Sequence, residues 1–143
     1  MTTLYLVRHG ETIDNAAQIL QGQLQGELNE KGIQQAEATR DELKNEQIDV
    51  FVSSDLKRSI DTCRIIAAPH HKDVEWPENV ESLEKLKSRA QNFLTYLKTS
   101  FPNQTVLAVG HGIINKAIQS VYYKKPMSEI HKMDNGEVRI YML

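Results

Sequence analysis

Short apolar runs mark the places where the chain is expected to form buried strands. Three of them, Leu4–Val7, Asp49–Ser53 and Thr105–Val109, are each about as long as one strand. A continuous apolar run is typical of a strand buried on both faces of a parallel sheet. A fourth run, Val138–Met142, follows the turn-forming residues Asp134–Gly136 and is predicted to close the sheet as an edge strand.

Between these runs, apolar residues recur at intervals of three and four positions, which predicts amphipathic helices. The apolar stripes span residues 33–43, 56–67, 83–97 and 114–121. Asn29 is expected to cap the first helix, which should run to about Asn45, with an inward face of Ile33, Ala36, Arg40 and Leu43. Ser54 or Asp55 is expected to cap the second helix and Pro69 to end it. Residues 68–81 are expected to hold one brief strand.

The alternation of strands and helices predicts a three-layer α/β/α fold with a mainly parallel sheet and one antiparallel edge strand. A chain of 143 residues is expected to form a single domain, residues 1–143. Crossovers between parallel strands are right-handed, so the ends of the first strand and of Thr105–Val109 should lie on one edge of the sheet. Open α/β sheets bind their ligands at this edge.

Composition and charge narrow the classes of partner. The formal net charge is −2, from 17 basic and 19 acidic side chains, so no overall field attracts nucleic acid or an anionic membrane. The single cysteine, Cys63, excludes an intrachain disulfide and fits a reducing compartment. The sequence has neither a secretion-signal pattern at its start nor an apolar stretch of about 20 residues. We therefore expect a cytoplasmic protein without nucleic-acid or membrane partners; the sequence does not specify its oligomeric state.

Two predicted strand ends are followed by residues that a buried core would not select. Arg8-His9-Gly10 follows the first strand, and Gly110-His111-Gly112 follows the last of the three buried runs. Arg58 falls in the first turn of the second helix, where its guanidinium and the free backbone N–H groups can face the same anion. Taken singly, these residues also fit a salt-bridged arginine beside a surface histidine, and an exposed Arg58 paired with Asp55 or Asp61.

Two arginines and two histidines around one point predict a phosphate site with a nucleophile. Phosphoryl transfer needs charge stabilisation on the equatorial oxygens and a group that attacks in line with the leaving group. The arginines and one protonated imidazole can supply the first, and the other imidazole the second. A metal site is a weaker interpretation, because His9 and His111 lack metal-ligand spacing and two arginines would repel a divalent cation. No metal and no cofactor is therefore predicted.

These residues, with others spread over nearly the whole chain, resemble the histidine phosphatase superfamily, also called phosphoglycerate mutase-like. The resemblance rests on Leu6–Thr12, Asn15, Gln21-Gly22, Leu28–Ala36, Ser53–Arg58 with Thr62, and Val109–Gly112. It implies that His9 is phosphorylated during turnover and that Arg8, Arg58 and His111 hold the phosphoryl oxygens. It also implies that the substrate pocket is lined by Asn15, Gln21 and Gly22.

The chain also departs from the family pattern. Typical members carry a long insertion between the Arg58-type helix and the next, which covers the site and includes an acid that protonates the leaving group. Here that stretch is only Ala68–Glu81, and its carboxylates, none in a family-like context, are Asp73, Glu75, Glu78 and Glu81. Asp55 replaces a usual proline, and Asn115 and Lys116 stand where arginine is often found. The short phosphohistidine phosphatases of the superfamily are similarly reduced, which argues against mutase activity on a small sugar phosphate.

Three functions follow from these observations. The first is a phosphatase that acts through a covalent phosphohistidine intermediate on phosphomonoesters or phosphoramidates, with phosphoproteins among the candidate substrates. The second is a non-catalytic phosphate- or phosphoprotein-binding domain that has lost its general acid. The third is a metal-dependent hydrolase, which full activity in excess chelator would exclude. His9 discriminates between the first two, because a protein that only binds phosphate could replace it without loss.

Overall fold

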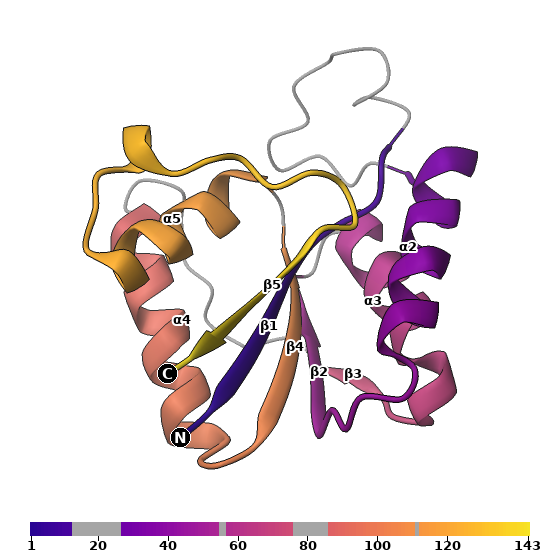
Figure 1. Cartoon of the computed structure of the whole chain (residues 1–143), viewed down its shortest axis with the longest axis horizontal. Helices are drawn as coiled ribbons and strands as arrows, with labels where there is room; N and C mark the ends of the chain where they lie inside the picture. The colour runs from indigo at the N-terminus through magenta and orange to yellow at the C-terminus, as the bar shows by residue number, and fades with distance from the viewer. Residues whose placement is uncertain (13–26, 55–56, 76–85, 111) are drawn as a thin grey trace.

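The computed structural model describes residues 1–12, 27–54, 57–75, 86–110 and 112–143, which form a five-stranded sheet with helices on both faces (Figure 1). The strands are β1 (Thr3–Arg8), β2 (Val50–Ser53), β3 (Val74–Glu75), β4 (Thr105–Gly110) and β5 (Val138–Met142). The helices are α2 (Glu30–Leu43), α3 (Lys57–Ala67), α4 (Leu86–Ser100) and α5 (Gly112–Tyr123), with 3-10 turns at Ala68–His70 and Met127–Glu129. Within these residues no helix combines the length and the apolar character that crossing a membrane requires.

The strand order is β3-β2-β4-β1-β5, which puts β4 in the centre of the sheet. β1 runs parallel to β4 from Thr3 opposite Thr105 to Arg8 opposite Gly110, so these two strands end side by side. β2 and β3 continue the parallel sheet, whereas β5 pairs antiparallel with β1 at the edge. The predicted fold class is therefore confirmed, as is the brief strand expected within residues 68–81.

Helices α2 and α3 pack together on one face of the sheet, and α4 and α5 pack together on the other (Figure 1). Successive residues of β1 alternate between the two layers. Leu6 belongs to the apolar cluster under α4 and α5, and Val7 belongs to the cluster under α2 and α3. Because both faces of the central strands are covered, every position needs an apolar side chain, which explains why the sequence pattern is a continuous run.

The buried face of α2 differs from the predicted one. Asn29 caps the helix as expected, since its Oδ1 accepts a hydrogen bond from Gly32 N at 2.8 Å. The prediction is wrong at Ile33, which is 43% exposed, and at Arg40, because the buried positions are Gly32, Ala36, Thr39 and Leu43. The helix turns Gly32 inward because this residue packs against backbone, where an added Cβ would overlap the carbonyl oxygen of Glu11.

Helix α3 ends where the sequence predicted, since Ala67 is followed at once by the 3-10 turn that contains Pro69. Neither of its two predicted capping residues is confirmed. Asp55 lies outside the described residues, and the buried Oγ of Ser54 has no hydrogen-bond partner among the described ones. Positions 56 and 83 of the predicted stripes also lie outside the described residues.

Candidate active site

β1 and β4 are neighbouring strands whose chains leave toward opposite faces of the sheet. After Arg8 the chain continues to α2 on one face, and after Gly110 it continues to α5 on the other (Figure 1). Open α/β sheets bind ligands outside the carboxyl ends of strands whose chains diverge in this way. His9 lies at this point, and its backbone N–H donates to Gly110 O at 3.1 Å.

Three of the seven predicted site residues are described by the structure, and all three are buried. The exposed fraction is 9% for Arg8 and 2% for both His9 and Arg58. The other four lie outside the described residues: Asn15, Gln21, Gly22 and His111. Charged and imidazole side chains are seldom this deeply buried without a specific role, so the three described residues mark the strand ends as a candidate site.

One hydrogen bond sets the protonation of the His9 imidazole. Its Nδ1 lies 2.7 Å from Gly10 O. A carbonyl oxygen only accepts hydrogen bonds, so Nδ1 carries the proton, and in the neutral ring the lone pair then belongs to Nε2. A buried imidazole in this tautomer presents Nε2 as a nucleophile or as a proton acceptor.

Arg8 brings a guanidinium to the same strand end. Its Nη1 donates to Met133 O at 2.8 Å, a neutral partner that leaves the positive charge in place. Burial lowers the pKa of Arg8, and the nearby Asp134 carboxylate raises it. An arginine keeps its proton at any ordinary pH, and one carbonyl occupies only one of its five N–H donors.

Arg58 lies in the first turn of α3, as predicted, and is fully enclosed rather than exposed. The alternative pairing with Asp61 is not the one found, because Asp61 bonds to Lys57 at 2.7 Å. Helix α3 contacts the loop after His9 through Thr62, whose hydroxyl donates to Arg58 O at 2.8 Å and accepts from Gly10 N at 3.1 Å. Among the described residues, the buried side chains include these two arginines and no Asp or Glu.

The chain leaving His9 is packed tightly against the start of α2. An added Cβ on Gly10 would overlap the carbonyl oxygen of Gly32, so both positions require glycine. Glu11 N donates to Gln35 Oε1 at 2.8 Å. The Glu11 carboxylate accepts from Asn29 Nδ2 at 2.9 Å, so Glu11 ties the loop to the helix and is engaged away from the imidazole.

The candidate proton donors of the sequence analysis are not close to His9 where the structure describes them. Asp73 and Glu75 are exposed at β3. Two strands, β2 and β4, separate β3 from β1, and strand spacing makes this separation about 14 Å. Glu78 and Glu81 lie outside the described residues.

Sequence reasoning missed the side chains that hold the site together. Asn135 was expected only to form a turn, yet its Nδ2 donates to His9 O at 2.9 Å. Asn115 was noted only as a departure from the family, yet it is buried and its Nδ2 donates to Val7 O at 3.1 Å. One signal could have located Asn135, because pairing the last strand antiparallel to the first puts the preceding turn beside Arg8 and His9.

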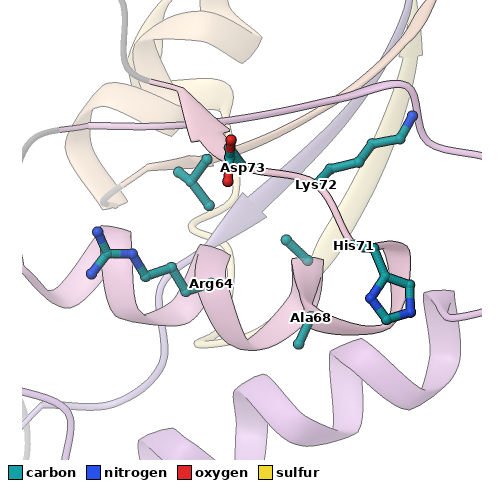
Figure 2. A pocket seen from close by; sticks show the side chains of 7 residues that line it. Arg64, Ala68, His71, Lys72 and Asp73 are labelled. Atoms are coloured by element: carbon teal, nitrogen blue, oxygen red, sulfur yellow. The ribbon is translucent and has the colours of Figure 1, made fainter.

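A pocket of about 450 Å³ lies at the other end of α3 and contains none of the predicted site residues (Figure 2). Its lining is Arg64, Ala67, Ala68, His71, Lys72, Asp73 and Val74. Among the described residues, no group of three His, Cys, Asp or Glu side chains could hold a metal ion. Burial raises the pKa of the Cys63 thiol to about 12, so at neutral pH it stays protonated and is no nucleophile.

Comparison with protein-family models identifies the family of the chain. A model described as the histidine phosphatase superfamily (branch 1) matches residues 4–78 and 70–143, which together cover nearly the whole chain. The two matched segments overlap at residues 70–78, which lie between α3 and α4 in the sequence.

Individual proteins resemble the chain to different extents. Phosphoglycerate mutase-like protein 4 of Arabidopsis thaliana is 30% identical over 184 residues, covering 98% of this chain and 79% of that protein. The probable phosphoglycerate mutase GpmB of Yersinia pestis (strain Pestoides F) is 48% identical over 67 residues, covering 47% of this chain and only 31% of that protein. A solved structure of a phosphoserine phosphatase mutant from Entamoeba histolytica, in complex with phosphoserine, superposes with a TM-score of 0.88 at 22% identity, covering 99% and 91% of the two chains.

Proposed function

The chain belongs to the histidine phosphatase superfamily, and on this premise we propose that it is a phosphatase in which His9 carries the phosphoryl group. His9 Nε2 attacks phosphorus, the N–P bond forms, and the bond to the leaving group breaks. The leaving group departs with its electron pair and takes up a proton. Water then attacks the phosphohistidine, which releases phosphate and restores the imidazole.

The observation that carries this proposal is the hydrogen bond from His9 Nδ1 to Gly10 O, at 2.7 Å, in a buried ring. It keeps the proton on the nitrogen away from the reaction and leaves Nε2 with its lone pair. A non-catalytic phosphate-binding domain, the alternative function, needs positive charge but has no need of a histidine held in this tautomer. The phosphatase is therefore the better supported of the two.

The remaining site residues supply charge in this proposal. Arg8 and Arg58 carry buried guanidinium groups, one at the end of β1 and one at the start of α3. In a site shielded from water, such fixed positive charges stabilise the phosphoryl oxygens strongly. His111 is assigned the same role, and Asn15, Gln21 and Gly22 are assigned to the pocket wall, on the family resemblance alone.

The proposed substrates are phosphomonoesters with good leaving groups, phosphoramidates and phosphorylated side chains of proteins, rather than the phosphoglycerates of a mutase. The support is the short segment after β3. Aligning this chain of 143 residues with the Arabidopsis thaliana relative takes 184 positions, so at least 41 positions of the alignment hold no residue of this chain. The family match divides into two segments that overlap at residues 70–78, which supports a shortening in the stretch where the family resemblance implies a cover of the site. We further propose a metal-independent reaction in the cytoplasm.

The decisive experiment traps the intermediate. The protein is mixed with a phosphoryl-labelled aryl phosphate, quenched in alkali, and digested to locate the label. We expect an acid-labile, base-stable label on His9, no label and no turnover in the folded variant His9→Ala, and normal labelling in His71→Ala, an exposed histidine at the other end of α3. Full activity in excess chelator is expected as well. A label on serine, or full activity of His9→Ala, would refute the mechanism.

A further inference from the structure

Gly10 joins two peptide groups whose four polar atoms are all engaged. The first peptide presents His9 O and Gly10 N, and the second presents Gly10 O and Glu11 N. Gly10 O accepts from the imidazole of His9, so its position decides which ring nitrogen keeps the proton. Glycine has the widest backbone freedom of any residue, so these peptides need external partners to stay in one orientation.

The first peptide is held at both of its ends by side chains that are distant in sequence. Thr62 Oγ1 accepts from Gly10 N at 3.1 Å, and Asn135 Nδ2 donates to His9 O at 2.9 Å. Thr62 is completely buried, and its own proton goes to Arg58 O at 2.8 Å, which orients the oxygen lone pair toward Gly10. No rotation of this peptide can keep both bonds.

The second peptide is held by Gln35 of α2, whose Oε1 accepts from Glu11 N at 2.8 Å. The turn that carries Asn135 is itself anchored, since Gly136 N donates to Arg8 O at 3.0 Å and Gly136 O accepts from Thr39 Oγ1 at 2.8 Å. Each of the three holding side chains thus comes from a different part of the sequence: α2, α3, and the turn before β5.

We propose that Thr62, Asn135 and Gln35 are positioning residues that fix the two peptides around Gly10 and thereby hold His9 with its proton on Nδ1 and its lone pair on Nε2. None of them needs to touch the substrate. Free imidazole favours the other tautomer, with the proton on Nε2, so a loosened Gly10 removes the nucleophile without removing the histidine. This inference rests on the proposed function for its kinetic consequence, while its structural consequence concerns the His9 ring alone.

The test uses Gln35→Met and Thr62→Val, which keep size and lose the hydrogen bonds, and Asn135→Leu. Thr62→Ser keeps the hydroxyl and should recover most of the activity. Thr2→Val is the matched control, because Thr2 is also buried and its hydroxyl donates to Phe101 O at 2.9 Å, away from the carboxyl ends of the strands. Thermal melting of each variant separates loss of fold from loss of position, and Gln35→Met, in a partly exposed helix position, serves if a buried variant does not fold.

Two readouts are measured. The nitrogen-15 chemical shifts of the His9 ring report its tautomer. The functional readout consists of kcat and the affinity for inorganic phosphate. We expect Gln35→Met and Asn135→Leu to move the ring toward the Nε2-protonated form and to lower kcat about ten- to a hundredfold, with phosphate affinity within twofold. A variant that combines Gln35→Met with Asn135→Leu should have a kcat only slightly lower than that of either single variant, because the hydrogen bonds act as a unit. An unchanged tautomer in all three variants would overturn the inference. If the wild type forms no phosphohistidine, the proposed function fails, and the tautomer shift still decides this inference.

Discussion

An arginine and a histidine lie at each end of α3, buried at one end and exposed at the other. At its start, Arg58 lies beside the loop of His9, and both side chains are 2% exposed. At its other end, Arg64 and His71 are exposed on the wall of an open pocket (Figure 2). There the side chains of Arg64, His71 and Lys72 point in different directions (Figure 2), and Lys72 Nζ donates to Asp49 O at 3.1 Å.

The difference shows what turns an arginine and a histidine into a site. At the strand ends the imidazole is fixed by hydrogen bonds and the guanidinium groups are shielded from water, so their charges and lone pairs are oriented before a ligand arrives. At the far pocket, water screens the charges and the side chains keep their rotamer freedom. We therefore expect phosphate to bind at the start of α3 and not at the pocket at its other end.

The largest effect should appear across leaving groups. Asp73 and Glu75, the described carboxylates of the shortened segment, are exposed at the edge strand β3 rather than at the strand ends. If the site holds no positioned acid, hydrolysis forgoes a rate gain of about 10²–10⁴ on poor leaving groups. We expect kcat/KM for p-nitrophenyl phosphate and phosphohistidine peptides to exceed that for phosphoglycerate or fructose phosphates by a factor in this range. Rates within tenfold of each other would mean that a proton donor is present, and Asp134 beside Arg8 would be the first described candidate.

The next effect compares Arg58→Ala with Arg64→Ala, two arginines on one helix. Losing a charge-assisted contact from the buried end should weaken phosphate or vanadate binding by about 1.5–3 kcal/mol, roughly ten- to a hundredfold. Arg64→Ala should leave affinity unchanged within twofold. Calorimetric titration of the folded variants measures both, with Arg58→Lys retaining charge but not the planar fork. Equal affinity of wild type and Arg58→Ala would place Arg58 outside the phosphate site.

The smallest effect concerns the carboxylates of the shortened segment. Alanine at each in turn should change the rate on p-nitrophenyl phosphate by less than about tenfold, because an aryl leaving group needs little protonation. The variants are Asp73→Ala, Glu75→Ala, Glu78→Ala and Glu81→Ala. Initial rates at saturating substrate are sufficient for this comparison. A hundredfold drop at any one of them would mean that this segment supplies the acid, and the proposed preference for good leaving groups would have to be withdrawn.

The sequence by itself determined the layers of the fold and the place of Arg8 and His9 at the end of a central strand. Continuous apolar runs predicted the central strands because a strand covered on both faces has no polar side, and this was confirmed for β1 and β4. Right-handed crossovers predicted that the ends of β1 and β4 lie on one edge of the sheet, and the structure shows Arg8 directly opposite Gly110 there. These conclusions rest on hydrophobic periodicity and chain geometry, which can be read directly from the sequence.

Only the tertiary structure decided which face of α2 is buried, which tautomer His9 adopts and what holds it. Ile33 has the right spacing for the core, yet contact between Gly32 and the backbone of Glu11 turns it outward. Thr62 and Asn135 reach the His9–Gly10 peptide from 52 and 126 residues away. Hydrogen bonds of this kind depend on distances and angles between segments that meet only after folding, and the residue types involved are common in helices and turns for other reasons.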